Sequence, residues 1–297
     1  MKKTIFALLH KTRILRLVAW MNRNKVSILC YHSVTERPDP QPNDLHKLHL
    51  QRERFVAHVD YIQSHYRIIA LADFVRARRE KSDLPPGAAI LTFDDGYRNF
   101  LSVVAPILLE RGIPATSFIV TGSHFTHQVS EPGGQWSLMD DDSHMSWNEI
   151  RQLAGAGIEF GSHTATHAPL SDIPPAEAQA ELQDSLNALS SNLALTNVSL
   201  SYPHGKTSEA VNKLAESVGY ACALTTALGQ NDANCDLFAL KRTVISADDD
   251  VPTLAARLSG LTWWWGLARG LTPASATAAL PADHPRYDPF VASNPEV

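Results

Sequence analysis

The stretch AAILTFDDGY, residues 88–97, joins a run of strand-forming residues directly to two aspartates and a glycine. Residues 88–93 are apolar or β-branched, which is typical of a buried strand, and the Asp-Asp-Gly that follows predicts a turn. Functional side chains in α/β folds collect at the carboxyl ends of strands, where the loops converge. This junction is therefore both a fold signal and a candidate reaction centre.

Strand and helix patterns alternate on both sides of this stretch. The predicted strands are residues 26–32, 67–71, 88–93, 115–120, 158–163, 198–205 and 220–226, and the predicted helices are residues 52–66, 71–81, 100–112, 147–157, 175–193 and 208–219. Such alternation indicates βα units and mostly parallel strands. About seven units predict an α/β barrel, closed or nearly so, and a doubly wound open sheet is the alternative.

The composition indicates one main domain, which we place at residues 26–260. The chain has 297 residues, of which 44% are apolar, enough for one substantial core. A net charge of -5 argues against a general nucleic-acid binder, because binding phosphates requires clustered cations. The three cysteines form no CxxC pair, so we expect neither a disulfide framework nor a thiolate zinc site. A reducing compartment is the simpler interpretation.

The two ends of the chain differ from the domain. Residues 1–25 begin like a signal peptide, but His10, Lys11, Arg13 and Arg16 interrupt the apolar run, so we expect neither secretion nor a membrane span. Their pattern predicts a basic amphipathic helix that either packs on the domain or lies on an anionic membrane surface. We therefore expect a cytoplasmic protein, with peripheral contact at the inner face of the membrane as the open alternative.

Two further segments lack a regular pattern. Residues 121–146 predict a long loop beside the strand ends. Residues 261–297 begin with LTWWWGLARGL, which is either a packing segment or a membrane-interface anchor, and continue into a tail that we expect to be disordered.

Histidines follow a second strand end. His163 closes the predicted strand 158–163, and His167 comes four residues later. Two imidazoles with one carboxylate match the ligands of hydrolytic zinc and of other divalent ions. A bound cation lowers the pKa of its water from about 15.7 to about 7, so attack by hydroxide becomes feasible at neutral pH. Successive side chains point in different directions, so one of Asp94 and Asp95 can bind the ion while the other takes the proton.

Each motif alone has an ordinary explanation. An isolated Asp-Asp-Gly is usually a turn, and HTATH, residues 163–167, could be the solvated start of a helix. Their joint occurrence at strand ends of one predicted sheet favours the metal site.

The motifs together resemble a known family. The segments LTFDDGY (91–97), SHTATH (162–167) and SYPHG (201–205) are similar, in order and spacing, to the first three motifs of the polysaccharide deacetylases, carbohydrate esterase family 4. The similarity covers about residues 26–245. It implies a distorted (β/α)7 barrel, a divalent metal ion with zinc as the expected identity, and hydrolysis of an N-acetyl group on an amino sugar.

The resemblance also assigns roles to residues. Asp94 corresponds to the catalytic base, and the metal ligands correspond to Asp95, His163 and His167. The turn after the strand 198–205 corresponds to the segment whose backbone N–H holds the oxyanion, so the expected substrate and oxyanion residues are Tyr202, Pro203, His204 and Gly205. His204 stands where the family usually has a tyrosine, and we interpret it as a groove wall or a third ligand.

Two departures from the family pattern require substitutes. The third motif usually begins with an arginine that orients the base, but here the position is Ser201. Arg242 is a candidate replacement, although it could be an ordinary surface arginine. The late histidine that protonates the leaving amine is also missing, and His32 at the end of the first strand can replace it in a closed barrel. A histidine supplied by the first strand resembles the permuted motif order of the family branch that deacetylates poly-N-acetylglucosamine. The alternative for His32 is a structural role at the end of its strand.

The predicted function is removal of N-acetyl groups from amino-sugar units of a polysaccharide or glycan intermediate. The expected partner is such a glycan, and no oligomeric state is predicted. Three alternatives remain: an amidohydrolase for a small non-sugar amide, an O-deacetylase, and an inactive glycan-binding module.

Overall fold

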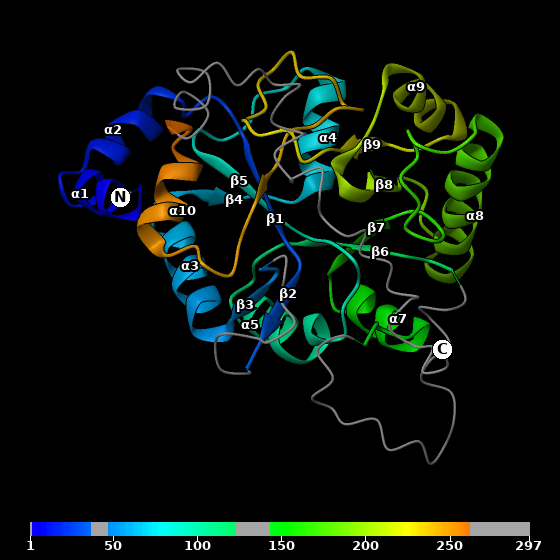
Figure 1. Cartoon of the computed structure of the whole chain (residues 1–297), viewed down its shortest axis with the longest axis horizontal. Helices are drawn as coiled ribbons and strands as arrows, with labels where there is room; N and C mark the ends of the chain where they lie inside the picture. The colour runs from blue at the N-terminus through cyan, green and yellow to red at the C-terminus, as the bar shows by residue number, and fades with distance from the viewer. Residues whose placement is uncertain (1, 37–46, 123–142, 262–297) are drawn as a thin grey trace, which may run out of the picture.

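The computed structural model describes residues 2–36, 47–122 and 143–261, in which parallel strands form one curled sheet with helices packed outside it (Figure 1). The strand order is β10-β1-β5-β6-β7-β8-β9, with β4 also paired to β5. The strands of this sheet are β1 (Ser27–Tyr31), β4 (Arg67–Ile68), β5 (Ala88–Phe93), β6 (Thr116–Ile119), β7 (Glu159–Ser162), β8 (Ser199–Ser201), β9 (Cys222–Leu224) and β10 (Thr243–Val244). A small second sheet pairs β2 (Ser33–Thr35) with β3 (His49–Gln51).

The helices lie mostly between successive strands of the chain. They are α1 (Lys2–Lys11), α2 (Ile14–Met21), α3 (Arg52–His65), α4 (Leu71–Glu80), α5 (Ala105–Glu110), α7 (Trp147–Gly155), α8 (Pro175–Leu193), α9 (Glu209–Val218) and α10 (Val251–Leu258). A π-helical segment, η1 (Phe100–Val104), leads into α5, and a short 3-10 turn, η2 (Pro203–Gly205), follows β8. None of the described helices combines the length and the hydropathy that crossing a bilayer requires.

The stretch 88–93 forms β5, which pairs with β1, β4 and β6. Every residue of β5 and every residue of β1 is buried, as expected for parallel strands covered on both faces. On one face Phe93 stacks on Tyr31 with ring centroids 5.3 Å apart and packs edge-on against Phe100. The core on this face therefore lies between β1, β5 and η1, and Phe93 of this core immediately precedes Asp94.

One segment connects the two ends of the sheet. Leu240 forms a parallel bridge to Leu224 of β9, and Thr243 of β10 pairs in parallel with Leu29 of β1. Residues 240–244 therefore lie between the first and last strands. The strands follow one another without the reversal of order that defines a doubly wound sheet, so the predicted distorted (β/α)7 barrel is confirmed and the open alternative is wrong.

The predicted elements from residue 26 to residue 226 are present, and the differences have local causes. The expected N-terminal helix is two helices, because Arg13 adopts a left-handed backbone with φ 61° between α1 and α2. The sequence patterns did not predict β2, β3, β10 or α10. The strands among these have two or three residues, too few to show a period, and α10 depends on Asp250, whose side chain accepts from the Thr253 N–H. Of the segment 261–297, with its Trp-rich stretch and predicted tail, all but residue 261 lies outside the described residues, as does most of the loop 121–146.

We expect Gly161→Ala to lower the free energy of unfolding by about 1–3 kcal/mol, because strand β7 has no space for a methyl group there. A Cβ at Gly161 would lie 2.5 Å from Phe118 Cε1 and 2.8 Å from the Ser199 carbonyl oxygen. Gly155→Ala is the matched control: a Cβ there meets no atom within 4 Å, and alanine favours the helix. Denaturant unfolding of both variants measures the difference, and equal effects would contradict the packing seen around β7.

Candidate active site

Polar side chains from the carboxyl ends of four strands, and one from the segment before β10, meet at one edge of the barrel. Asp94 and Asp95 follow β5, and His163 follows β7. Ser201 ends β8, His32 follows β1, and Arg242 comes from the segment that connects β9 to β1. The structure therefore brings the two proposed substitutes, His32 and Arg242, to the same place as the three sequence motifs.

Asp95, His163 and His167 form a group of possible metal ligands. One donor atom from each lies within 4.8 Å of the others. The distance from Asp95 Oδ1 is 3.4 Å to His163 Nε2 and 3.5 Å to His167 Nε2. Ligands about 2.0–2.1 Å from a tetrahedral zinc ion are about 3.3–3.4 Å from one another, so this donor set fits such an ion.

Hydrogen bonding prepares His163 for this role. Its Nδ1–H donates to the Ser201 carbonyl oxygen at 2.7 Å, which leaves Nε2 directed toward Asp95. A backbone acceptor on one ring nitrogen fixes the tautomer and the orientation of a histidine ligand. His163 is 2% exposed, so this orientation is also held by packing.

The electrostatics favour a cation between these residues. Burial lowers the pKa of His167 to about 3, helped by the neighbouring His163, so His167 is neutral at pH 7. Burial also lowers the pKa of His163, but the carboxylates of Asp94 and Asp95 outweigh it and raise that pKa above its usual value. Burial alone would raise the pKa of Asp95, yet the surrounding histidines hold it well below its usual range. The group therefore contains a carboxylate whose charge a divalent ion would balance.

Unusual backbone conformations place the ligands. Asp95 has φ 73°, and His167 has φ 64°, both left-handed. Gly96 follows with φ 76°, and a Cβ there would lie 2.9 Å from Ile119 Cγ2, so only glycine fits this turn against β6. The possible helix start at 163–167 is wrong, because these residues form an irregular loop.

Glu181 of α8 holds this histidine loop. Its Oε2 accepts from the N–H of Ala165 at 3.0 Å and of Thr166 at 2.8 Å, and its Oε1 accepts from the Thr166 hydroxyl at 2.7 Å. The loop lies between the two histidine ligands, so these bonds help to set their separation. Sequence reasoning missed Glu181, because nothing in the pattern of α8 distinguishes it from a solvated helix residue.

Asp94 lies beside the ligand group, with Oδ2 3.9 Å from His163 Nε2, and is surrounded by hydrogen-bond donors. Arg242 donates to both of its oxygens, from Nη1 to Oδ1 and from Nη2 to Oδ2, each at 2.7 Å. The Ser201 hydroxyl donates to Oδ2 at 3.0 Å, and Arg242 Nη2 also donates to Ser201 Oγ at 2.8 Å. Ser201 and Arg242 therefore bind the same carboxylate and each other.

Arg242 is fully buried, so the interpretation as an ordinary surface arginine is wrong. Its Nε donates to the Thr225 carbonyl oxygen at 2.9 Å, and Nη1 also reaches Thr92 Oγ1 at 3.3 Å. Burial alone would raise the pKa of Asp94, but Arg242 and His163 hold it well below its usual value. Asp94 is therefore ionised at neutral pH.

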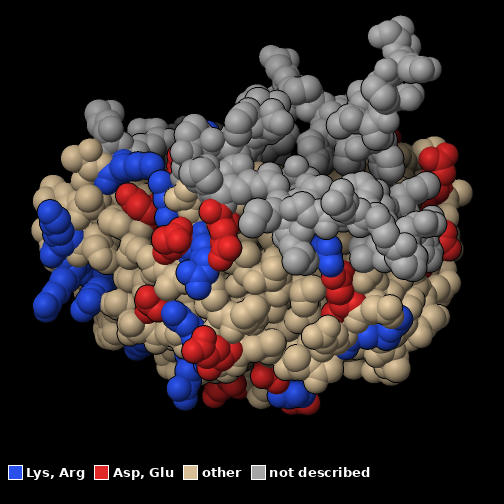
Figure 2. Space-filling model, turned by 90° about the horizontal axis from the view of Figure 1, so that it is seen from below, with Lys and Arg blue, Asp and Glu red and all other residues tan. Residues whose placement is uncertain are grey.

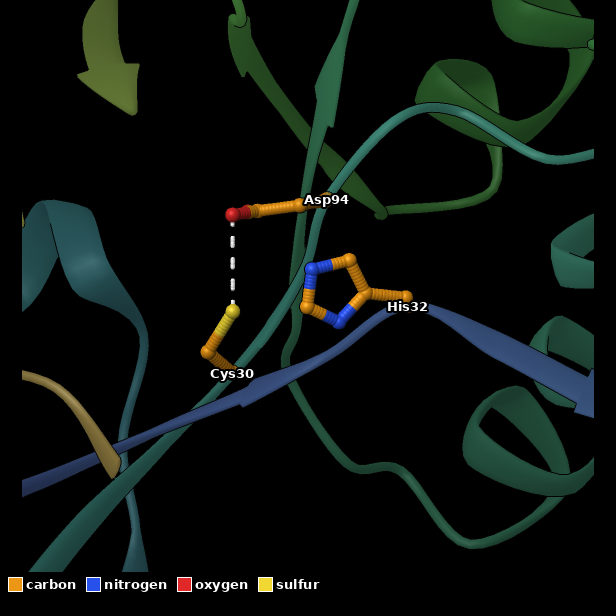
Figure 3. A group of neighbouring side chains, drawn as sticks. All are labelled: Cys30, His32 and Asp94. Carbon is orange, nitrogen blue, oxygen red and sulfur yellow. Dashed lines mark hydrogen bonds between the residues drawn. The ribbon is translucent and has the colours of Figure 1, made fainter. Parts of the chain in front are cut away.

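His32 and Cys30 also lie beside Asp94 (Figure 3). The three residues each offer an atom within 4.8 Å of the others, and the Cys30 thiol donates to Asp94 Oδ2 at 3.4 Å. His32 Nδ1 is buried, and no residue in the described part of the chain offers it a hydrogen-bond partner. Sequence reasoning missed Cys30, although the two-residue period of a strand places positions 30 and 32 on the same face.

The turn after β8 separates its predicted residues. His204 is exposed with φ 57°, and its ring centroid is 4.9 Å from that of His167. Gly205 has φ 67°, and a Cβ there would clash with Thr226. The prediction that the Tyr202 side chain faces the site is wrong. Its ring is buried in the core, and its hydroxyl donates to the Phe238 carbonyl oxygen at 3.1 Å. Pro203, the first residue of the 3-10 turn, is buried too.

Two further residues border the site, and the spacing of the sequence motifs did not reveal them. Tyr97 and His144 form an antiparallel bridge and stack with ring centroids 5.3 Å apart. Burial lowers the pKa of His144 to about 4, although the charge of Asp95 opposes the shift. His144 comes from the end of the long loop, and its neutral ring borders the ligand group.

Comparison with known sequences relates the chain to one family. Residues 81–223 match the family model "Polysaccharide deacetylase". YxkH of Bacillus subtilis (strain 168), whose name assigns it to the polysaccharide deacetylases, is 25% identical over 77% of this chain and 75% of its own length. The poly-beta-1,6-N-acetyl-D-glucosamine N-deacetylase of Escherichia coli (strain K12) is 30% identical, and this match spans 33% of the chain and 15% of that longer protein.

Solved structures show the same fold. The Streptococcus pyogenes deacetylase PplD, solved in complex with acetate, aligns with a TM-score of 0.67 at 22% identity and covers 79% of this chain and 98% of its own. IcaB from Ammonifex degensii aligns with a TM-score of 0.62 at 20% identity over 80% of this chain and 97% of its own.

We expect Arg242→Met to lower the free energy of unfolding of the metal-free protein by about 3–5 kcal/mol, because Asp94 is left as a buried charge without a partner. Adding Asp94→Asn removes that charge and should recover part of the loss. Arg257→Met is the control, since Arg257 pairs with Asp249 at 3.0 Å but its side chain is 26% exposed. Urea unfolding in the presence of a chelator measures all three, and a loss no larger than that of the control would contradict the ion pair.

Proposed function

We propose that this chain, which carries a polysaccharide deacetylase domain, removes N-acetyl groups from the amino-sugar units of a polysaccharide or glycan intermediate by metal-dependent hydrolysis. The observation that carries the proposal is the pair of adjacent aspartates with opposite surroundings. Asp95 lies 3.4 and 3.5 Å from two imidazole nitrogens, whereas Asp94 is bound by Arg242 and Ser201. Such a division suits one carboxylate for an ion and the other for a proton.

Asp95, His163 and His167 would hold the ion, for which zinc is the expected identity. Three protein ligands leave a coordination position open, as in catalytic rather than structural zinc sites. When bound, such an ion lowers the pKa of water and polarises the acetamide carbonyl.

Asp94 would accept the proton of the attacking water. The paired Arg242 keeps it ionised and the hydrogen bond from Ser201 fixes its orientation, so the base needs no rearrangement before the reaction. The water oxygen forms the new bond to the acetamide carbon. The backbone N–H of His204, next to the ligand group, would stabilise the oxyanion that develops on the carbonyl oxygen.

His32, which lies beside Asp94, would complete the cycle. When the C–N bond breaks, the amine nitrogen needs a proton, and a protonated imidazole beside a carboxylate can donate one. His32 is partly exposed, so its ring is accessible to a substrate. The products are acetate and a free amino sugar.

The names of the relatives support the amino-sugar substrate. The matches in Escherichia coli and in Staphylococcus epidermidis are named poly-beta-1,6-N-acetyl-D-glucosamine N-deacetylases, and the latter is 21% identical over 76% of this chain and 81% of its own length. A panel of N-acetylated oligosaccharides, O-acetylated sugars and small amides tests this choice. Equal release of amine and acetate from the N-acetylated sugars supports it, and acetate without amine would indicate an O-deacetylase.

Asp94→Asn should reduce turnover by about 10²–10⁴-fold, because the asparagine cannot accept a proton. The variant should retain zinc in equilibrium dialysis, since Asp94 is bound by Arg242 rather than placed among the ligands. Asp95→Asn, one position along the chain, is the control that should lose affinity for zinc. Substantial residual turnover by Asp94→Asn would remove Asp94 from the role of base.

Removal of the metal by a chelator should abolish turnover, and added zinc should restore it, because the ion supplies the electrophile and lowers the pKa of water. Amine release before and after dialysis, together with metal content by mass spectrometry, measures this. An inactive glycan-binding module would bind sugar without turnover in either state, and activity that survives complete metal removal would contradict the proposed site.

A further inference from the structure

The two N-terminal helices expose an unusual amount of apolar surface. Among the described residues, five of the six exposed large hydrophobic side chains lie between positions 8 and 21, and the sixth is Leu109. The five are Leu8, Ile14, Leu17, Trp20 and Met21, with exposed fractions of 62, 43, 59, 59 and 70%. In α2, positions 14, 17 and 21 lie on one face, because residues three and four apart are neighbours on a helix. We refer to these five side chains as the apolar patch.

Cations surround the apolar patch. The segment 1–35 contains seven Lys or Arg and no Asp or Glu. Those with exposed side chains are Lys3, Lys11, Arg13, Arg16 and Arg23. Figure 2 shows Lys and Arg side chains gathered at the edge of the molecule that α1 and α2 occupy in Figure 1. An apolar surface among cations, without any anion of its own segment, is complementary to an anionic lipid surface.

The body of the protein holds these helices in place. Phe6 and Leu15 are buried in the main core, on the side opposite the exposed residues. Asn22 Nδ2 donates to the Ser259 carbonyl oxygen at 2.9 Å, and Arg16 Nη2 lies 2.9 Å from His65 Nε2. The alternatives from the sequence, packing on the domain or facing a membrane, therefore describe two sides of the same helices.

Trp20 gives the patch a residue suited to a lipid interface. Its ring is exposed, and the Arg23 guanidinium lies 4.3 Å from the ring centroid. Tryptophan and arginine prefer the level of the lipid headgroups, where an aromatic ring meets both chains and water.

We propose that α1 and α2 form a docking surface for an anionic membrane, on which the protein rests without crossing it. The apolar patch enters the boundary between headgroups and acyl chains, and the surrounding cations pair with lipid phosphates. The deacetylase site would then work on glycans close to a membrane. This inference does not depend on the proposed reaction, because lipid binding can be measured without turnover.

Flotation of the full chain with vesicles tests the proposal. The protein should float with vesicles of phosphatidylcholine and phosphatidylglycerol, and much less with phosphatidylcholine alone. Added salt should weaken the binding, because screening shortens the reach of the cations. A protein that stays unbound in the presence of the anionic vesicles would overturn the proposal.

Two sets of variants separate charge from apolar contact. Lys3→Gln, Lys11→Gln and Arg13→Gln together should weaken binding by about fivefold for each cation removed. The control removes the same number of charges elsewhere, with Arg76→Gln in α4, Lys81→Gln just after α4 and Lys213→Gln in α9. This control should leave binding unchanged. Lys81 also matches Arg13 in its left-handed backbone, with φ 53° against 61°.

Leu17→Gln with Met21→Gln should weaken binding to anionic vesicles about tenfold or more, whereas Leu109→Gln outside the patch should not. Thermal unfolding of each variant checks that the exposed substitutions leave the fold intact. Binding that all these variants retain would overturn the proposal. A concentration-dependent dimer in light scattering that Leu17→Gln and Met21→Gln abolish, without vesicle binding, would also overturn it, because the patch would then join two copies of the chain.

Discussion

The ion pair between Asp94 and Arg242 is the interaction on which the site depends. Both side chains are buried, so water does not compensate their charges. A buried pair is tolerated only when its geometry is good and the remaining donors find acceptors. Here the guanidinium reaches both oxygens of Asp94, the Thr225 carbonyl oxygen and two hydroxyls. These partners come from β5, β8 and the residue after β9, so the pair is satisfied only in the assembled barrel.

The same constraint explains why neighbouring aspartates have different surroundings. Asp94 directly follows β5, and its buried carboxylate binds Arg242, which belongs to the segment that closes the barrel. Asp95 adopts a left-handed backbone, which turns its carboxylate toward His163 and His167. The two residues are chemically identical, so the residue type alone does not distinguish their roles. The separation of roles therefore comes from the ring of donors on one side and the histidine loop, held by Glu181, on the other.

The N-terminal helices bury some of their apolar side chains and expose others. Phe6 and Leu15 attach them to the body, while apolar side chains such as Leu17 and Met21 stay exposed beside cations. Burial of apolar surface favours folding, so a fold that leaves five such side chains in water on one small segment has not used its full hydrophobic stabilisation. Contact with lipid would remove these side chains from water and add that stabilisation.

The sequence by itself determined the parallel α/β barrel, because strand and helix periods are local properties. It also singled out Asp94, Asp95 and His163, which follow strand ends, and His167, which lies four residues after His163. It suggested His32 and Arg242 but left their surroundings open. Only the tertiary structure decided that Arg242 is buried against Asp94, that Cys30 joins them and that the Tyr202 ring belongs to the core. The physical reason is distance along the chain: Arg242 meets Asp94 148 positions away, through the pairing of β10 with β1, and no local pattern encodes that contact.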